Sequence, residues 1–344
     1  MNYKKREYKK TFKIACYGVR PNEVPYFNQF NKYDYQLTFI EELLTHENIT
    51  TAKNHDAVLL RGNCVADKEN LEKLNDYGIR YVFTRTVGVN HIDLAVAENY
   101  HMHVARVPSY SPNAIAELSL TLAMMLLRHT AYATNRTAHK NFIVDETMFS
   151  KEVRNCTVGI IGTGRIGLTE AKLFSGLGAH VIGYDVYQSD AAKEVLTFKT
   201  QDKLLAESDI VSIHVPHIPG KNDQMINQTF LGKMKSDAIL VNTARGELQD
   251  NEAILTALEN NQLAGFGTDV FANEKDLFFK AFKIDQPLPD PIIQKLIDLY
   301  PRVLVTPHIG SNTDEALKNM ITTSFDNFND ILTAGISKNE VKPA

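Results

Sequence analysis

Short apolar runs alternate with longer amphipathic stretches along the chain, and the alternation falls into two blocks. In the first block, a helix is predicted over residues 68–77. The apolar runs around it predict strands over residues 12–17, 56–60, 81–84 and 103–107. Strands that alternate with helices are typical of parallel sheets with crossover helices, so this block predicts an α/β domain.

The second block opens at Thr157 and repeats the pattern. Its predicted strands cover residues 157–161, 180–184, 210–214, 238–242, 265–269 and 303–306. Its predicted helices cover residues 167–177 and 251–259, and a last helix follows over about 313–334. Residues 273–301 carry four prolines, and we expect them to decorate the edge of this block. The whole chain is therefore expected to form two doubly wound parallel-sheet domains.

One apolar helix links the two blocks. Ser111 is placed to cap this helix and Pro112 to fill its first position. The pattern extends the helix to about residue 135, with apolar residues on most faces. Such a helix must be buried on several sides. This favours a homodimer, although a monomer that buries the helix between its domains is an alternative.

Composition narrows the class of protein. Of the 344 residues, 44% are hydrophobic and 23% are charged, which is ordinary for a globular chain of two domains. The net charge of -4 leaves no basic excess for a phosphate backbone, so nucleic acid is not an expected partner. The three cysteines show no close pairing, and no apolar stretch has the length of a membrane span. We expect a cytoplasmic protein whose basic residues 1–10 form a solvated lead-in.

A glycine-rich turn follows the first strand of the second block. Gly162, Gly164 and Gly167 have the spacing G-x-G-x-x-G between a buried-strand pattern and a helix. The first permits a tight turn, the second lets backbone amides approach a pyrophosphate, and the third lets helix and strand pack closely. Asp185 closes the next strand, where a carboxylate can accept ribose hydroxyls and repel a 2′-phosphate. The pattern predicts an NAD site rather than an NADP site, with a plain turn cluster as the alternative.

Three residues of different chemistry stand just past predicted strand ends: Arg245, Glu274 and His308. Ligands of an open parallel sheet bind outside the carboxyl ends of its strands, so the three could meet in one crevice. Hydride addition to a 2-oxo acid needs a proton donor, a carboxylate that orients it, and a planar cation for the substrate carboxylate. Histidine, glutamate and arginine suit these roles, although each taken singly is more often an ordinary loop residue. No metal is expected.

Several motifs resemble those of the D-isomer-specific 2-hydroxyacid dehydrogenases, in order and in spacing, over nearly the whole chain. They are residues 162–167 (GTGRIG), 214–216 (HVP), 242–246 (NTARG), 306–308 (TPH) and 108–117 (PSYSPNAIAE). The resemblance implies a Rossmann NAD domain, residues 111–308, inserted in a flavodoxin-like substrate domain. That substrate domain would comprise residues 1–110 plus 309–344.

The resemblance also implies roles for individual residues. Arg245 would orient the substrate, Glu274 would support the histidine, and His308 would donate the proton. The implied cofactor-binding residues are Gly162, Gly164, Arg165, Ile166, Gly167, Asp185, Val215, Pro216, Asn222, Thr243, Ala244 and Asp269. The amides of Val87 and Gly88 would hold the substrate carboxylate, and Tyr110 would be a further substrate-binding residue.

Shorter segments point to a narrower group. Residues 60–64 (LRGNC), 127–132 (LRHTAY) and 151–156 (KEVRNC) resemble the (R)-2-hydroxyglutarate dehydrogenases of glutamate-fermenting bacteria. Arg61 ends an apolar run, so it stands at the carboxyl end of a predicted strand. A second guanidinium there would suit a distal carboxylate, such as that of 2-oxoglutarate. The alternative is a surface arginine that closes a strand.

Two other functions stay open. Many D-lactate-type members carry an aromatic pair after the histidine, whereas this chain has Gly310-Ser311-Asn312, which should open the pocket. A dehydrogenase for D-lactate, D-2-hydroxyisocaproate or phenyllactate is nevertheless the main alternative. A non-catalytic NAD-sensing module that resembles a transcriptional corepressor is the alternative of another class. It would need partner-binding tails, and this chain offers only a short basic start.

Overall fold

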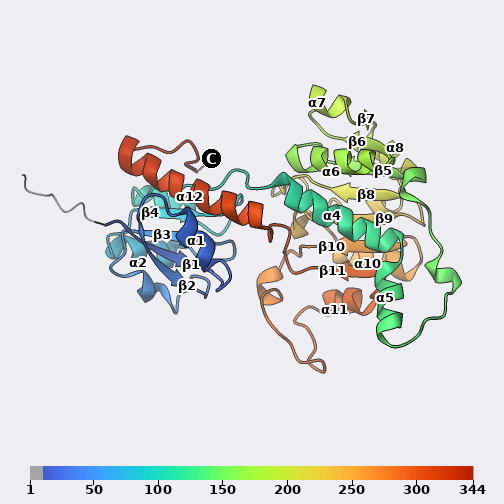
Figure 1. Cartoon of the computed structure of the whole chain (residues 1–344), viewed down its shortest axis with the longest axis horizontal. Helices are drawn as coiled ribbons and strands as arrows, with labels where there is room; N and C mark the ends of the chain where they lie inside the picture. Colours follow the sequence, from blue (N-terminus) through green and yellow to red (C-terminus); the bar gives the residue numbers. More distant parts are fainter. Residues whose placement is uncertain (1–10, 344) are drawn as a thin grey trace, which may run out of the picture. The chain divides into compact units, whose positions relative to one another are not determined.

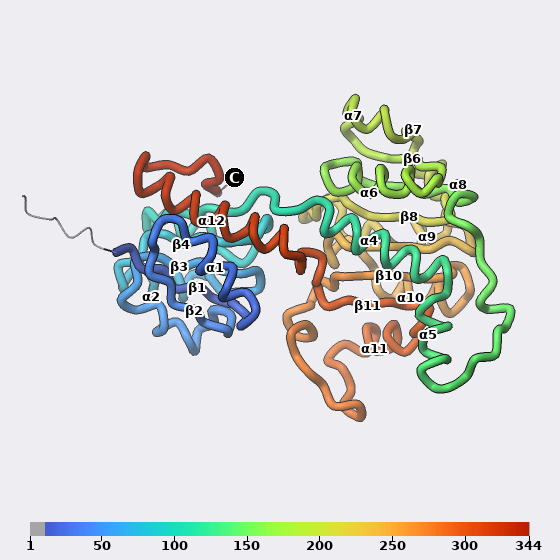
Figure 2. Tube along the Cα trace, viewed as in Figure 1, coloured from blue at the N-terminus to red at the C-terminus, as the bar shows by residue number. Residues whose placement is uncertain are grey.

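The structure is a computed structural model that describes residues 11–343. The chain divides into two compact units, one made of Met1–Ser111 with Asn312–Ala344 and the other of Pro112–Ser311. The chain therefore passes from the first unit into the second and back, which the reader can follow in Figure 2. These bounds lie close to the predicted domain bounds. The lead-in predicted for residues 1–10 lies outside the described residues.

The first unit contains a parallel sheet of four strands in the order β2-β1-β3-β4 (Figure 1). The strands are β1 (Lys13–Tyr17), β2 (Gln36–Ile40), β3 (Ala57–Leu60) and β4 (Tyr81–Thr84). The helices are α1 (Val24–Phe30), α2 (Lys68–Asp76), α3 (Leu94–Asn99) and α12 (Asp314–Ala334). β3 is buried along its whole length, as expected of a central parallel strand.

Helix α12 returns the C-terminal part of the chain to this first sheet. Thr313 caps the helix, because its side chain accepts a hydrogen bond from the backbone amide of Ala316. Phe325 and Phe328 are buried on the inner face of the helix, and the ring of Phe328 stacks on Phe83 with centroids 4.2 Å apart. The core of the first unit is therefore built from both parts of the chain.

Parts of the first unit differ from the sequence prediction. The strand predicted over residues 103–107 is wrong, because His103 and Ala105 form only isolated bridges, to Tyr81 and Glu340 respectively. This segment divides its backbone hydrogen bonds between β4 and the C-terminal residues, so no continuous ladder forms. The prediction also misses α1, α3 and β2. β2 lies at the edge of the sheet and is exposed or half-exposed along its length, which removes the apolar pattern.

The second unit contains a parallel sheet of seven strands in the order β11-β10-β9-β8-β5-β6-β7 (Figure 1). The strands are β5 (Thr157–Ile161), β6 (His180–Tyr184), β7 (Thr197–Phe198), β8 (Ile210–Ile213), β9 (Ile239–Asn242), β10 (Gly265–Thr268) and β11 (Val303–Val305). The helices are α4 (Pro112–Leu127), α5 (Thr130–Ala138), α6 (Arg165–Gly176), α7 (Asp190–Lys193), α8 (Gln201–Glu207), α9 (Gln228–Leu231), α10 (Asn251–Glu259) and α11 (Pro291–Asp298). Among the strands, the prediction misses only the short edge strand β7. The predicted fold class of two parallel-sheet α/β domains is confirmed.

The predicted linking helix is two helices. His129 adopts a left-handed backbone with φ 50° and separates α4 from α5, so the single helix predicted to residue 135 is wrong. α4 lies on β9 and β10 and packs against α6. Contacts inside the second unit therefore bury part of α4, whereas its apolar residues Leu120, Met124 and Met125 stay half-exposed.

Residues 273–301 form the crossover from β10 to β11. They contain a short 3-10 helix, Glu274–Asp276, and then α11. α11 packs against α10 and against β11, which is an edge strand, so the segment decorates the sheet edge as predicted.

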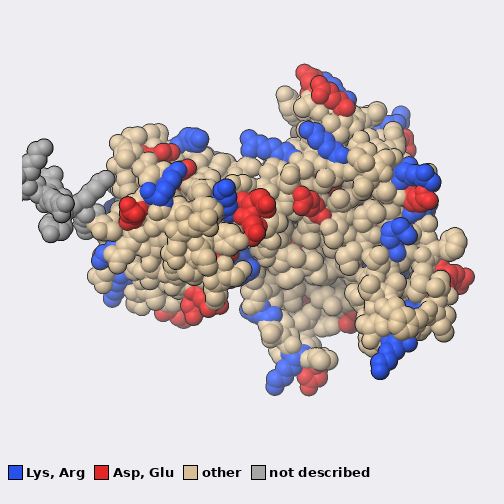
Figure 3. All heavy atoms as spheres, in the orientation of Figure 1, with Lys and Arg blue, Asp and Glu red and all other residues tan. Residues whose placement is uncertain are grey.

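The surface mixes both signs of charge. In Figure 3 the acidic and basic side chains of the described residues are interspersed over the visible face of each unit. Within residues 11–343, no helix combines the length and the apolar character needed to cross a membrane. Nor do the histidine, cysteine and carboxylate side chains of that range gather into a group that could hold a metal ion. All three cysteines are buried and free.

Candidate active site

The glycine-rich turn lies at the switch point of the second sheet. β5 pairs with β6 on one side and with β8 on the other, so the chain order reverses around the strand that leads into the turn. Gly162 has φ 92°, and a Cβ there would lie 2.7 Å from the carbonyl carbon of His214. A Cβ at Gly167 would lie 1.9 Å from the carbonyl oxygen of Gly162. Both positions therefore require glycine.

The start of α6 fits a dinucleotide phosphate. Its N-cap residue is Gly164, which has no side chain to bond the amides of the first turn. Nothing lies within 4 Å of a Cβ built at Gly164, so the space there is open to a ligand. At the end of β9, the hydroxyl of Thr243 is buried without a hydrogen-bond partner in the described part of the chain. Free amides and an unsatisfied buried hydroxyl at one sheet edge are features that a polar ligand would satisfy.

Asp185 lies beside this turn, directly after β6. Its carboxylate accepts a hydrogen bond of 2.6 Å from the backbone amide of Thr163 and one of 3.0 Å from that of Tyr187. The position suits a group that binds ribose hydroxyls. The carboxylate also braces the turn itself, a use that the sequence pattern did not indicate.

The other predicted cofactor residues lie at the same edge of the sheet. Val215 and Pro216 follow β8, and Asn222 closes their loop by donating a hydrogen bond of 2.8 Å to the carbonyl oxygen of Pro216. Thr243 and Ala244 follow β9, while the predicted residues Arg165 and Ile166 open α6. A ligand that extends from the glycine turn along this edge would meet them in order.

Asp269 follows β10, and its carboxylate holds the loop after β11. It accepts hydrogen bonds from the hydroxyl of Thr306 at 2.6 Å, the amide of Ile309 at 2.8 Å and the amide of Gly310 at 2.9 Å. Burial raises the pKa of Asp269, while these donors act in the opposite direction. The resemblance implies that Asp269 lines the cofactor. The structure adds that it braces the loop around His308, which sequence spacing did not reveal.

His308 and Glu274 are brought together, as predicted. Nδ1 of His308 lies 2.8 Å from Oε1 of Glu274, and the Glu274 side chain is only 14% exposed. The backbone of His308 is left-handed, with φ 53°, and its amide donates to the carbonyl oxygen of Asp269 at 3.0 Å. Because Nδ1 faces the carboxylate, Nε2 is the ring nitrogen available to a substrate.

Arg245 lies on the neighbouring loop, after β9. Its guanidinium donates to the carbonyl oxygen of Ala244 at 2.6 Å. The buried amide of Asn242 donates to the carbonyl oxygen of Arg245 at 3.0 Å and to Oε1 of Gln249 at 2.7 Å. Gln249 in turn donates to the carbonyl oxygen of Val270 at 3.2 Å. This network, which the sequence did not single out, ties the Arg245 loop to the segment after β10.

The predicted substrate-binding backbone lies in the first unit, after β4. The hydroxyl of Thr86 donates to the carbonyl oxygen of Gly88 at 2.8 Å, and Arg106 donates to the carbonyl oxygen of Val87 at 3.1 Å. These bonds fix the loop through its carbonyl groups. The carbonyl oxygen of Tyr110 accepts a hydrogen bond of 2.6 Å from Asn319.

Arg61 follows β3, as predicted, and belongs to a cluster that the sequence did not reveal. Arg85, which follows β4 and is 2% exposed, donates to the carbonyl oxygen of Gly18 at 2.6 Å and to Glu23 at 3.0 Å. Arg61 lies 3.9 Å from the same Glu23. Burial, followed by the charge of Arg85, lowers the pKa of Arg61 to about 10. Arg61 and Arg85 therefore share the carboxylate of Glu23.

Comparisons with known proteins decide the family. Residues 120–310 match the model of the D-isomer specific 2-hydroxyacid dehydrogenase NAD binding domain. The chain belongs to the D-isomer-specific 2-hydroxyacid dehydrogenases. It is 37% identical over 330 residues to the aromatic 2-oxoacid reductase of Clostridium sporogenes, covering 95% of this chain and 98% of that protein. It is 36% identical over 333 residues to the D-lactate dehydrogenase of Lactiplantibacillus plantarum, covering 96% and 99%.

A solved structure gives the same result. The NAD-complexed D-isomer specific 2-hydroxyacid dehydrogenase of Lactobacillus delbrueckii ssp. bulgaricus is 35% identical and superposes with a TM-score of 0.82, covering 96% of this chain and 100% of that one. The protein is therefore an NAD-dependent oxidoreductase that acts on CH–OH donors, and its cofactor is NAD. The enzyme interpretation is confirmed over the NAD-sensing module. The narrower resemblance to 2-hydroxyglutarate dehydrogenases finds no support in these relatives.

Proposed function

We propose that this enzyme transfers a hydride reversibly between NADH and the α-carbon of a 2-oxo acid, with His308 as the proton donor. The observation that carries the proposal is the 2.8 Å contact between Nδ1 of His308 and Glu274 at the carboxyl edge of the second sheet. NADH supplies the hydride. As the hydride reaches the α-carbon, the carbonyl oxygen of the substrate gains negative charge and takes the proton from Nε2 of His308. The carboxylate of Glu274 keeps the ring oriented so that Nε2 faces the substrate.

Arg245 grips the carboxylate of the substrate. Its planar guanidinium can form two parallel hydrogen bonds to a carboxylate, which fixes the α-carbon in one pose. The short contact to the carbonyl oxygen of Ala244 orients the guanidinium beforehand. The amides of Val87 and Gly88 are assigned to the same substrate carboxylate on the strength of the family resemblance.

NAD would be held along the carboxyl edge of β5, β6, β8 and β9. The amides at the start of α6 would donate to the diphosphate, and Asp185 would accept hydrogen bonds from the hydroxyls of the adenosine ribose. Gly162, Gly164, Arg165, Ile166 and Gly167 form the turn, and Val215, Pro216, Asn222, Thr243, Ala244 and Asp269 line the remainder of the site.

The leading substrate is a dicarboxylate, 2-oxoglutarate, which would be reduced to (R)-2-hydroxyglutarate. Arg61 supports this choice, because it follows β3 at the carboxyl edge of the first sheet and its side chain is only 17% exposed. Its planar guanidinium can form two parallel hydrogen bonds to a distal carboxylate. A second candidate is an aromatic 2-oxo acid, favoured by the 37% identity to the aromatic 2-oxoacid reductase. The remaining candidate substrates are pyruvate, for a D-lactate dehydrogenase, and 2-oxoisocaproate, for a D-2-hydroxyisocaproate dehydrogenase.

A substrate panel tests the assignment. The fall of NADH absorbance is followed with 2-oxoglutarate, phenylpyruvate, pyruvate and 2-oxoisocaproate. Arg61→Ala should lower kcat/KM for 2-oxoglutarate by about 10- to 1000-fold more than for the monocarboxylates, since a buried charge loses its partner. Arg80→Ala, at an exposed arginine of the same unit, is the matched control. A wild-type preference for a monocarboxylate, or an equal loss on all substrates in Arg61→Ala, would show that the substrate is not a dicarboxylate.

A homodimer is proposed as well. A groove of about 910 Å³ in the second unit is lined by apolar residues of α4 and by Phe149, Leu263 and Ala264. Phe149 is 88% exposed although it lines the groove, and Phe142 (76%) and Val144 (81%) of the same segment are exposed too. A second copy can cover these apolar side chains.

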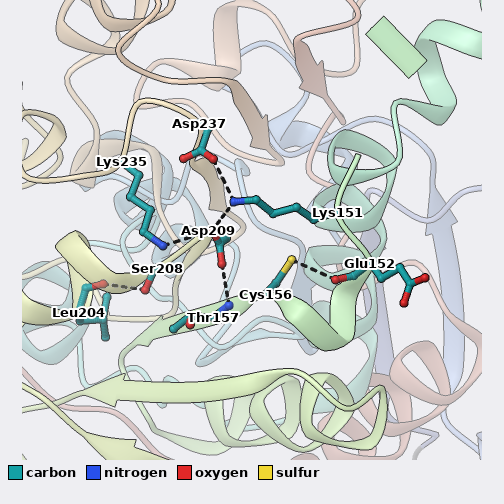
Figure 4. Close-up of polar contacts among 9 residues, drawn as sticks. All are labelled: Lys151, Glu152, Cys156, Thr157, Leu204, Ser208, Asp209, Lys235 and Asp237. Atoms are coloured by element: carbon teal, nitrogen blue, oxygen red, sulfur yellow. Dashed lines mark hydrogen bonds and ion pairs between the residues drawn. The ribbon is translucent and has the colours of Figure 1, made fainter. Parts of the chain in front are cut away.

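Ion pairs hold the polar part of the groove wall, which Lys151, Asp209 and Asp237 form. Lys151 donates to Asp209 at 2.8 Å and to Asp237 at 2.9 Å, as Figure 4 shows. Light scattering should give the mass of a dimer for the wild type and of a monomer for Phe149→Glu. Ile284→Glu, at a fully exposed residue outside the groove, is the control. A wild-type monomer would contradict the dimer, and a dimer mass in Phe149→Glu would show that this groove is not its interface.

A further inference from the structure

Glu170 and His214 form a buried pair that hydride transfer does not use. The Glu170 side chain on α6 is 0% exposed, and the His214 side chain, directly after β8, is 1% exposed. Nε2 of His214 lies 2.5 Å from Oε2 of Glu170. The two atoms therefore form a buried hydrogen bond between the imidazole ring and the carboxylate. Oε1 of Glu170 and Nδ1 of His214 find no hydrogen-bond partner among the residues that the structure describes.

The pair spans two walls of the dinucleotide turn. Glu170 lies three residues after Gly167 on α6, so it is one helical turn from the glycine that packs helix against strand. The backbone of His214 is the wall that a Cβ at Gly162 would strike, at 2.7 Å. The side chain of His214 therefore connects the end of β8, which leads into Val215, to helix α6. The amide of His214 also donates to the carbonyl oxygen of Ile161 at 2.7 Å, which fixes the same strand end to β5.

A third element joins the network. The hydroxyl of Ser212 lies 3.1 Å from Nε2 of His214 and 2.8 Å from the hydroxyl of Ser119. Ser119 and Ser212 are both fully buried, and Ser119 belongs to α4, which packs against α6. One chain of polar contacts therefore runs from α4 through β8 to α6, beneath the turn. Buried networks of this kind hold the elements that they connect in one relative position.

We propose that Glu170 and His214 are positioning residues for NAD. Their hydrogen bond keeps the amides at the start of α6 and the Val215 loop at the spacing that the dinucleotide bridges. The inference rests on the proposed location of the cofactor at the Gly162 turn. Replacing either partner alone leaves a buried polar group unsatisfied, whereas replacing both by leucine removes the bond without that penalty.

The test measures the Kd of NADH by its fluorescence, together with kcat and Tm, in matched variants. The double variant Glu170→Leu with His214→Leu should fold with a Tm near that of the wild type and raise the Kd at least about tenfold. Its kcat at saturating NADH should stay within about threefold of the wild type, since the reacting residues are not touched. Glu170→Gln keeps an oxygen that can accept from Nε2, so its Kd should remain close to the wild-type value. A double variant that binds NADH like the wild type overturns the proposal.

Two further variants separate the possible causes. Asp209→Asn breaks ion pairs at the opposite end of the same strand, where Asp209 accepts from Lys151, Lys235 and the amide of Thr157 (Figure 4). Asp209→Asn should lower the Tm and leave the Kd of NADH unchanged. If its Kd rose as much as that of the double variant, lost stability would explain both results and the positioning role would be overturned. Asp185→Ala reports on the location of the cofactor. If Asp185→Ala changes the Kd of NADH and the double variant does not, only the positioning role fails. If neither variant changes the Kd, the proposed cofactor site fails as well.

Discussion

Asp269 braces the loop that carries His308, and Asp269→Asn tests how much the reaction depends on that brace. The carboxylate accepts from the hydroxyl of Thr306 and the amide of Ile309 on one oxygen, and from the amide of Gly310 on the other. An asparagine amide accepts on one side only, so at least one donor faces an NH2 group. An unsatisfied buried donor costs about 1–3 kcal/mol. The left-handed backbone of His308, with φ 53°, is strained by about 1–3 kcal/mol. The weakened loop can release this strain by moving His308.

We therefore expect the free energy of unfolding to fall by about 1–3 kcal/mol in Asp269→Asn. The turnover should fall about 100-fold, because a displacement of roughly 1 Å in a reacting group has that effect. Urea denaturation measures the first quantity and NADH oxidation the second. Asp276→Asn, at an exposed aspartate of the same region, should change neither. Unchanged turnover in Asp269→Asn would show that the reaction does not depend on this brace. If the affinity for NADH fell as much as the turnover, Asp269 would act mainly by binding the cofactor.

The other predictions concern single groups. The wild type should prefer NADH over NADPH by about 10- to 1000-fold, and Asp185→Ala should narrow that ratio; equal use of both by the wild type contradicts the ribose site. His308→Ala should slow reduction by about 10²–10⁴ while NADH still binds, as fluorescence titration can check. Glu274→Gln should slow reduction while NADH still binds, because the ring of His308 loses the carboxylate that orients it; unchanged turnover argues against the pair. Arg245→Lys keeps the positive charge but loses the planar guanidinium that can form two parallel hydrogen bonds, so kcat/KM should fall at least about tenfold. Near wild-type turnover would show that Arg245 does not bind the substrate carboxylate in this way. Burial tends to raise the pKa of Asp209, but its hydrogen bonds hold it below the ordinary value. Its stabilising effect is therefore present at neutral pH and lost as the pH falls through the folded-state pKa. The difference in unfolding free energy between wild type and Asp209→Asn should shrink in acid, and a constant difference would contradict this.

Elements with a strong local signal could be predicted from the chain itself. The strands of the second unit are short apolar runs buried on both faces, so their pattern is continuous and their bounds came out within a few residues. β2 carries no such run, because an edge strand needs fewer apolar side chains. The break between α4 and α5 depends on the left-handed backbone of His129, a conformation that only a few per cent of non-glycine residues adopt. A pattern of apolar residues cannot indicate such a break.

By itself, the sequence determined which residue types stand at the carboxyl ends of the strands and where glycine must form a turn. These features depend on neighbours a few positions away. Only the tertiary structure decided which of those residues meet. Glu274 and His308 are 34 residues apart, and they meet because parallel strands bring their ends to one edge of the sheet. Glu170 and His214 are 44 residues apart, and they meet because α6 packs on β5, the neighbour of β8 in the sheet. Burial then decides which polar groups must find each other, since a polar group removed from water is costly without a partner.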